Sequence, residues 1–124
     1  MVVAALVDSG PHGRWAEDCI AREYLVAPEL LPAEVATILR RAALSGDISG
    51  DTASLAHGDL LSLRIDLIPY EPVAHRTWEL RQHLTVYDSW YVAIAELLGV
   101  PLATLDSRLT RAPGPQCTFA VPAK

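Results

Sequence analysis

One stretch, residues 85–106, constrains the fold more than any other, because it reads as a helix, a tight turn and a strand in direct succession. Apolar residues recur at helical spacing after Tyr91, and Asp88 begins the same stripe three residues earlier. The members of this stripe are Ile94, Ala95 and Leu98. Gly99 is predicted to end the helix, since glycine tolerates the left-handed backbone conformation that follows a last turn.

The strand predicted next, Pro101–Leu105, is short and apolar enough to be buried in a sheet. Asp106 follows directly, at the position where open α/β sheets bind their ligands. The carboxylate side chains of Asp88 and Asp106 are therefore expected to point toward a common site.

The composition fits one domain with a true hydrophobic core, because the chain has 124 residues and half of them are hydrophobic. The net charge of −5, with nine arginines and one lysine, is not the basic footprint of a duplex-DNA binder. It fits a carboxylate metal site, although an acidic chain is also ordinary. We expect no signal peptide, no membrane span, and two reduced thiols, Cys19 and Cys117, in the cytoplasm.

The remaining sequence alternates between helical and strand-like patterns. Helices are predicted over Arg14–Tyr24 after a turn at residues 8–13, over Leu31–Ala42 with Gly46 at its end, from a cap at Asp51, and from Pro72 to about Gln82. Strands are predicted over Leu25–Pro28, Ile65–Pro69 and Thr118–Val121, whereas Met1–Val7 could be a strand or a short buried helix. This order predicts a small α/β sandwich around a mostly parallel sheet.

Two of these helices also carry predictions about burial. In the helix after Asp51, Leu55 is expected to face the core, together with Ala56, Leu60 and Leu63. In the helix after Pro72, the residues expected to face inward are Val73, Thr77 and Leu80.

Three acids share a position at the start of a helix or the exit of a strand: Glu34, Asp88 and Asp106. Carboxylates gathered on one rim of a sheet repel each other unless a cation neutralises them, and Mg²⁺ or Mn²⁺ prefers such oxygen ligands. A bound metal of this kind can activate water and stabilise charge on a phosphate. The alternative is that each acid is a helix cap or favours the helix dipole.

Residues Tyr87–Glu96 and Gly99–Leu109 resemble the C-terminal signature of PIN-domain ribonucleases, most closely that of the VapC toxins of bacterial toxin–antitoxin pairs. Leu31–Val35 resembles the family's earlier acidic helix start. The resemblance runs from about Met1 to Val121. It implies a single PIN-like domain over residues 1–124, a three-layer sandwich with a mostly parallel sheet of four to five short strands flanked by helices. It also implies a Mg²⁺-dependent endoribonuclease that is neutralised by a cognate VapB-type antitoxin.

Carried over residue by residue, Glu34, Asp88 and Asp106 match three of the family's metal-site acids, and Thr104 matches a position close to that site. A β-branched strand residue is the plainer interpretation of Thr104. The sequence departs from the family at its start, where Met1–Val7 resembles the helix that follows a first strand ending in Asp. Asp8 is not expected to substitute for that Asp. We expect either that the chain begins downstream of the true start or that it is an inactive relic that binds antitoxin or dimerises.

Contacts to RNA and to protein partners complete the expectations. Phosphate contacts are expected from Arg40, Arg41, Arg108 and Arg111, for which a solvated helix face is an equal alternative. Trp90 is the predicted outward aromatic, either for stacking an unpaired base or for packing in a homodimer. The four histidines show no ligand spacing and are expected on the surface or in packing. An antitoxin tail is expected between the helix of Trp15 and the helix of Ile38–Leu39.

Overall fold

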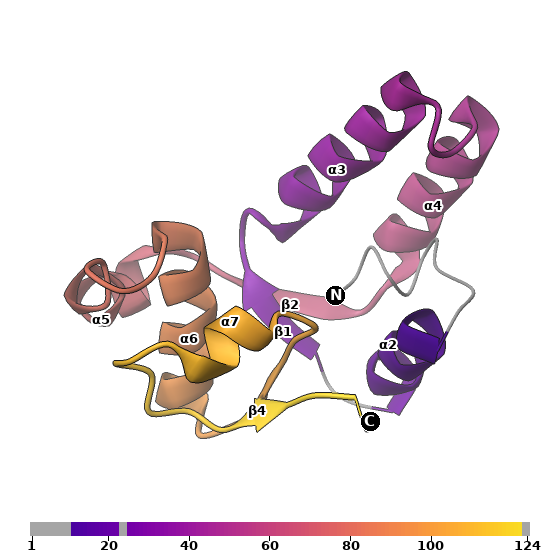
Figure 1. The fold of residues 1–124 in the computed structure, drawn as a ribbon. Helices are drawn as coiled ribbons and strands as arrows, with labels where there is room; N and C mark the ends of the chain where they lie inside the picture. The colour runs from indigo at the N-terminus through magenta and orange to yellow at the C-terminus, as the bar shows by residue number, and fades with distance from the viewer. Residues whose placement is uncertain (1–10, 23–24, 123–124) are drawn as a thin grey trace. The chain divides into compact units, whose positions relative to one another are not determined.

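The computed structural model describes residues 11–22 and 25–122, and these belong to two compact units. Unit 1 comprises Met1–Leu25 and Leu30–Asp66, and unit 2 comprises Val26–Glu29 and Leu67–Lys124 (Figure 1). The predictions for the apolar segment at residues 1–7 and for Asp8 lie outside the described residues. Each unit is described by itself below.

Unit 1 contains a helical hairpin of α3 (Leu31–Ser45) and α4 (Gly50–Ser62), which pack against each other. The α3 helix buries Leu31, Val35 and Leu39, one residue per turn along a single stripe. Gly46 ends α3 with a φ of 85°, a left-handed conformation that glycine adopts without a steric penalty. The predicted helix and its glycine stop are both confirmed. The hairpin is visible as the two purple and magenta helices in Figure 1.

The structure corrects three local predictions in unit 1. Helix α2 (Pro11–Arg22) begins before the predicted Arg14, because proline is pre-organised for the first position of a helix. Ser49, not Asp51, caps α4, since its hydroxyl accepts the N–H of Thr52 at 3.0 Å. Leu55 was expected to face inward but is 72% exposed, while Ala56 and Leu60 carry the buried stripe of α4.

Unit 2 is arranged around α6 (Val86–Leu98), the helix predicted first from the sequence. Thr85 caps it by accepting the N–H of Asp88 at 3.1 Å, and Gly99 ends it with a φ of 65°. The helix packs against η1 (Glu71–Val73) and α5 (Ala74–Glu79). The stripe was predicted to reach Leu98, but that side chain is 46% exposed because the buried part of α6 stops one turn earlier.

Two hydrophobic clusters hold unit 2 together. The first joins α6 to η1 and to the strand ends, and its members are Val26, Ile68, Tyr70, Val73, Trp90, Ala93 and Ile94. The second joins α6 to the C-terminal segments, and its members are Leu80, Leu84, Val92, Leu102, Leu109, Cys117 and Phe119. The predicted inward positions of the α5 region are confirmed, since Val73, Thr77 and Leu80 are all buried.

The described strands form two pairs. The first pair is β1 (Leu25–Pro28) with β2 (Ile65–Ile68), and in unit 2 the Glu29 N–H donates to the Ile68 carbonyl at 3.0 Å. The second pair is β3 (Leu102–Ala103) with β4 (Phe119–Ala120), which run parallel with Leu102 opposite Phe119. Helices combined with parallel strand pairing confirm the predicted α/β class.

An ion pair ties the C-terminal loop of unit 2 to its helices. Arg76 Nε donates to Glu96 Oε1 at 2.7 Å, and Arg76 Nη2 reaches both Glu96 Oε2 and the Gly114 carbonyl. The Gln116 N–H donates to Glu96 Oε2 at 2.7 Å. Burial raises the pKa of Glu96, but the hydrogen bonds from Arg76 and Gln116 outweigh it and lower that pKa overall. The pair therefore fixes residues 114–116 against α5 and α6.

We expect Glu96→Gln to lower the free energy of unfolding at pH 7 by about 1–3 kcal/mol, because charge-assisted bonds to Arg76 and Gln116 are lost. The folded pKa of Glu96 lies below its ordinary value of 4.5, so its contribution is complete above that value and is lost as the pH falls through the folded pKa. In urea unfolding, the difference between variant and wild type should therefore shrink at acid pH.

Glu79→Gln is the matched control, because Glu79 is 51% exposed and lies 3.8 Å from Arg76 Nη1. It should change the free energy of unfolding by less than about 0.5 kcal/mol. Equal losses in the two variants, or a difference for Glu96→Gln that does not shrink as the pH falls below 4.5, would contradict the stabilising role of Glu96.

Candidate functional site

Asp88 lies in the first turn of α6, on the most enclosed helix of unit 2 among the described residues. Its backbone N–H is held by Thr85 Oγ1, and the next residue, Ser89, is fully buried. The half-buried carboxylate has no hydrogen-bond or ion-pair partner among residues 11–22 and 25–122. The positive end of the helix dipole stabilises a carboxylate at this place. Asp88 is therefore held by a rigid element with its oxygens available to a cation.

Asp106 caps α7 (Ser107–Arg111), a short helix that was not predicted. Its Oδ1 accepts the N–H of Arg108 at 2.9 Å and that of Leu109 at 3.4 Å. The capping role left open by the sequence is thus confirmed for Asp106. A carboxylate has about four lone-pair positions, so the cap leaves Oδ2 able to bind a further cation or donor.

Thr104 connects the strand pair to Asp106. Its N–H donates to the Ala120 carbonyl at 3.0 Å, which extends the pairing of β3 with β4. Its Oγ1 accepts the N–H of Asp106 at 3.0 Å, and the side chain is only 8% exposed. The hydroxyl therefore fixes the backbone from which the Asp106 carboxylate projects.

Glu34 belongs to unit 1, in the first turn of α3. The backbone N–H donates to the Leu30 carbonyl at 3.0 Å, and the Oε1 atom is buried although the residue as a whole is half-buried. Pro32 stands at the start of the helix, as predicted. The local position expected for Glu34 is therefore confirmed, and its role as a ligand stays a prediction.

The structure places two of the three predicted acids, Asp88 and Asp106, in unit 2 and Glu34 in unit 1. Among the described residues, no three His, Cys, Asp or Glu side chains are grouped so that they could hold a metal ion. The available carboxylate oxygens of Asp88 and Asp106 are nevertheless the donor type that Mg²⁺ and Mn²⁺ prefer. The chemistry of the donors fits such a cation, and the full ligand set stays a prediction.

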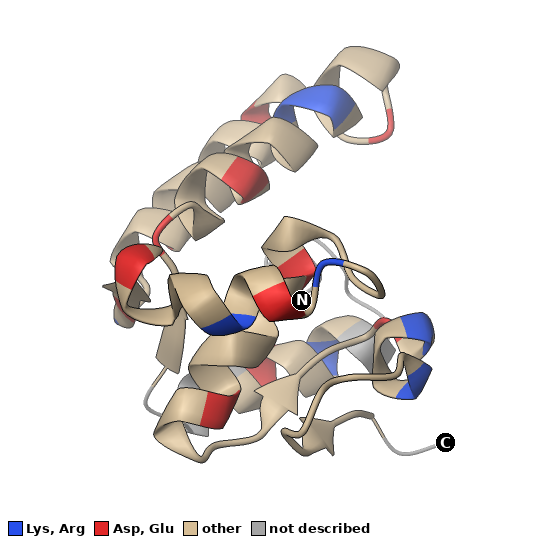
Figure 2. Cartoon of the chain, turned by 90° about the vertical axis from the view of Figure 1, so that its left-hand side faces the viewer, with Lys and Arg blue, Asp and Glu red and all other residues tan. Residues whose placement is uncertain are grey.

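The arginines predicted to contact phosphate are all exposed. Arg40 and Arg41 lie on α3, and Arg108 and Arg111 lie on α7. Figure 2 shows the basic positions in blue and the acidic positions in red along the ribbon. The Arg108 side chain is 89% exposed, and its Nε lies 3.7 Å from Asp106 Oδ1. Arg108 is thus an exposed positive charge beside one of the candidate acids.

The prediction that Trp90 faces outward is wrong. Trp90 is 6% exposed, and its ring meets Tyr70 edge to face, with the ring centroids 5.4 Å apart. The exposed tryptophan of this unit is Trp78, at 57%, which the sequence analysis did not single out. The predicted inward positions of Thr77 and Leu80 could have indicated that Trp78 is exposed. In a helix that buries residues 77 and 80, the side chain of residue 78 points away from the core.

Other side chains that could carry chemistry do not join the candidate site. His57, His75 and His83 are exposed, as expected, and the side chain of His12 is not described. Neither Cys19 nor Cys117 forms a disulfide bond in the described part of the chain. Burial, assisted by the charge of Glu96, raises the pKa of Cys117, which disfavours the reactive thiolate.

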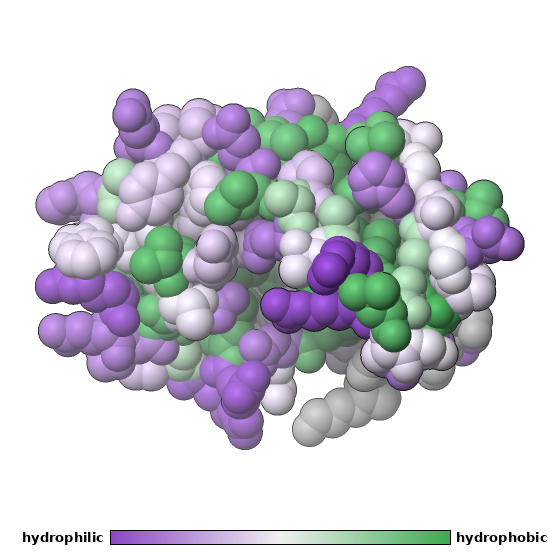
Figure 3. Space-filling model, turned by 90° about the horizontal axis from the view of Figure 1, so that it is seen from above, coloured by the Kyte–Doolittle hydropathy of each residue, from purple (hydrophilic) through white to green (hydrophobic). Residues whose placement is uncertain are grey.

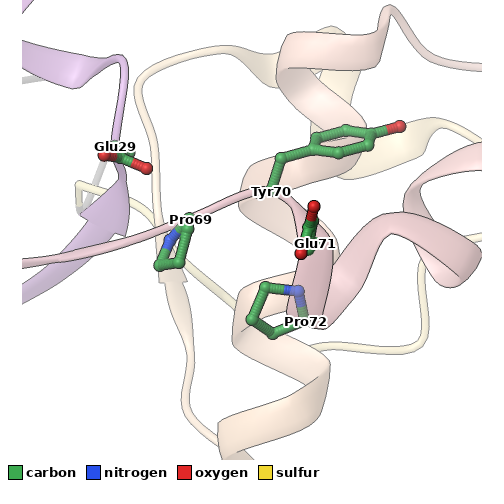
Figure 4. Close-up of a pocket in the computed structure, with 5 residues that line it drawn as sticks. All are labelled: Glu29, Pro69, Tyr70, Glu71 and Pro72. Atoms are coloured by element: carbon green, nitrogen blue, oxygen red, sulfur yellow. The ribbon is translucent and has the colours of Figure 1, made fainter.

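A shallow cavity of about 660 Å³ opens in unit 2 where β2 continues into η1. Its lining, drawn in Figure 4, consists of Glu29, Pro69, Tyr70, Glu71 and Pro72. None of the predicted metal ligands lines it. The cavity is therefore separate from the residues on which the predicted chemistry depends.

The surfaces predicted for partners are partly apolar. On α3, Ile38 is 47% exposed whereas Leu39 is buried, so only Ile38 of that pair can meet a partner. Figure 3 shows apolar residues, in green, interspersed with polar ones on one face of the molecule. Within residues 11–22 and 25–122, the structure contains no helix with the length and hydropathy needed to cross a membrane.

Comparison with known proteins gives one consistent family. Residues 1–115 match the PIN domain family. Ribonuclease VapC1 of Mycobacterium tuberculosis is 43% identical over 117 residues, which cover 94% of this chain and 88% of that protein. Ribonuclease VapC12 of the same species is 38% identical over 104 residues, covering 84% and 81% of the two chains. Ribonuclease VapC9, also from that species, is 34% identical over 119 residues, covering 96% and 91%. The chain therefore belongs to the PIN-domain family, as a member of its VapC type.

Proposed function

We propose that this chain is a metal-dependent endoribonuclease that acts as the toxin of a VapBC-type toxin–antitoxin pair in the cytoplasm. It would cleave RNA, inhibit translation or growth, and be neutralised by its cognate VapB-type antitoxin. The observation that carries the proposal is the 43% identity, over 94% of the chain, to a protein named as a ribonuclease. The helix-start positions of Glu34, Asp88 and Asp106 support it.

In this proposal, Glu34, Asp88 and Asp106 hold Mg²⁺ or Mn²⁺. When bound, the metal would act as a Lewis acid that lowers the pKa of a coordinated water and stabilises charge on the phosphate. Asp106 presents Oδ2 because its Oδ1 is committed to the α7 N–H groups, and Asp88 presents a carboxylate that no described residue engages. Thr104 holds the Asp106 backbone in place. Arg108 and Arg40 would contact RNA phosphates from exposed positions.

The proposed partners are the RNA substrate, the antitoxin and a second copy of the chain in a homodimer. The antitoxin would place an apolar tail against the helices that carry Trp15 and Ile38. A second candidate function is an inactive module that only binds antitoxin or dimerises. The observation that favours it is the cap that Asp106 forms on α7, because a capping acid needs no metal to explain its position.

We expect Asp88→Asn to lower the rate of RNA cleavage by about 100-fold or more, because a preorganised charge at the reacting phosphate is lost. EDTA should abolish cleavage by the wild type, and added Mg²⁺ or Mn²⁺ should restore it. The measurement is cleavage of a labelled RNA, together with growth arrest on expression in a bacterial host.

Asp51→Asn is the matched control, since Asp51 is an exposed acid in the first turn of another helix. Asp51→Asn removes one negative charge, as Asp88→Asn does, and should leave the rate of RNA cleavage unchanged. Cleavage and growth arrest that persist in Asp88→Asn would exclude Asp88 from the site. A wild type that binds the antitoxin and cuts no RNA under any divalent ion would favour the inactive module.

We expect Thr104→Val to weaken the function of Asp106, because valine has the same shape but cannot accept the Asp106 N–H. The unfolding free energy should fall by about 1–3 kcal/mol, since a half-buried N–H loses its partner. The Mg²⁺ concentration for half-maximal cleavage should rise severalfold, a change that loss of stability alone does not cause. Thr104→Ser keeps the hydroxyl, so its Mg²⁺ concentration for half-maximal cleavage should equal that of the wild type. An unchanged requirement in Thr104→Val would rule out this positioning role.

A further inference from the structure

Trp78 is an exposed aromatic side chain that the proposed metal chemistry does not use. It lies on α5, next to Thr77, which is fully buried. Leu80, directly after the helix, is only 2% exposed. Because those two residues face the core of unit 2, the indole ring is directed outward and stays 57% exposed. An exposed indole surrounded by polar side chains is a feature of binding surfaces more than of cores.

Arg81 is fixed against this indole. Its Cζ lies 4.5 Å from the centroid of the Trp78 ring, and its Nη1 donates to the Trp78 carbonyl at 2.8 Å. The hydrogen bond holds the guanidinium over the ring, where the cation–π interaction adds to it. The pair is therefore a preformed flat surface that carries a positive charge.

Arg81 can attract an anionic ligand although the chain as a whole has a net charge of −5, because no carboxylate among the described residues forms an ion pair with it. Residues 74–84 contain two arginines, two exposed histidines and one acid, Glu79. Glu79 lies 3.8 Å from Arg76, so its charge is partly compensated, and Arg76 is itself bonded to Glu96. Arg81 is thus left to interact with a ligand on the exposed side of α5.

We propose that Trp78 and Arg81 form a stacking platform for an unpaired base of single-stranded RNA. Proteins bind single-stranded nucleic acid by stacking bases on aromatic rings and arginine planes beside cationic groups. The surrounding exposed residues, His75, Gln82 and His83, are polar, which suits an RNA better than an apolar protein partner. The platform deepens the proposed ribonuclease function and rests on it for the identity of the ligand.

The platform and Asp88 belong to the same unit and are connected by a short segment. Arg81 and the α6 cap Thr85 are four positions apart in the chain, which spans at most about 14 Å, and Asp88 lies about 4.5 Å further along the helix. At 3.4 Å per stacked nucleotide, this distance is covered by on the order of six nucleotides. A single strand bound at Trp78 can therefore reach Asp88 within one binding site.

The first test measures the binding of a fluorescently labelled, unstructured single-stranded RNA of about 12 nucleotides by fluorescence anisotropy. EDTA is present so that the RNA is not cleaved during the measurement. Trp78→Ala should weaken binding by about 5- to 150-fold, the loss found when a stacking aromatic is removed. Trp78→Phe, which keeps an aromatic face, should bind within about threefold of the wild type. Arg81→Ala should weaken binding and Arg81→Lys should recover part of it. Circular dichroism confirms that each variant is folded.

Leu97→Ala is the matched control, because Leu97 is 62% exposed at the other end of α6 in the same unit. It should not change the affinity for RNA. Equal affinities of Trp78→Ala and the wild type would overturn the platform, as would a wild type that binds no single-stranded RNA. A change in oligomeric mass in Trp78→Ala, with RNA affinity unchanged, would overturn it in favour of an interface between protein copies.

The platform and the proposed nuclease fail separately. Asp88→Asn should lose cleavage and keep single-strand binding, whereas Trp78→Ala should raise the KM for RNA and keep cleavage at saturating RNA. If the wild type cuts no RNA but loses binding on Trp78→Ala, the platform stands and the nuclease proposal falls. If cleavage depends on Asp88 but binding does not depend on Trp78, the nuclease proposal stands and the platform falls.

Discussion

The burial of α6 is the constraint on which unit 2 depends. Four consecutive residues, 92–95, are each less than 5% exposed, so this part of the helix is enclosed on every side and not on one stripe. Its neighbours η1, α5 and β3 are positioned by packing against it. The N-terminus is fixed as well, because Thr85 caps it and Ser89 is fully buried one turn later. Asp88 is therefore presented by a rigid support, which is what a site needs if it is to hold a ligand in a defined geometry.

Capping a helix and binding a cation are compatible roles for the same carboxylate. At Asp106, one oxygen satisfies two N–H groups of α7, and the hydrogen bond from Thr104 fixes the backbone that carries it. A carboxylate held in this way loses little further entropy when its second oxygen binds an ion. The cap is therefore compatible with a role for Asp106 as a ligand. The exposed Arg108, 3.7 Å from Oδ1, provides a positive charge that a phosphate can recruit without leaving a buried charge unpaired.

Local signals in the sequence predicted those features that depend on neighbours in the chain. Gly46 and Gly99 end their helices as predicted, because a left-handed C-terminal residue is a requirement of the backbone alone. Trp90 was predicted wrongly because its burial depends on Tyr70, twenty positions earlier, and no local pattern contains that contact. The candidate acids could be chosen by residue type and helix-start position. The bond from Thr104 to Asp106 and the cap on α7 required coordinates, since they depend on side-chain directions.

The acidity of the chain limits how it can bind RNA. Carboxylates that are placed to hold a cation repel the phosphate backbone, and few basic residues are available to offset that repulsion. Stacking on an aromatic ring adds affinity through the face of a base, so it is not opposed by the acids. This makes an exposed pair such as Trp78 and Arg81 more valuable on an acidic protein than on a basic one. It also separates the two tasks in space, since α5 would retain the strand while the starts of α6 and α7 present the groups that act on its backbone.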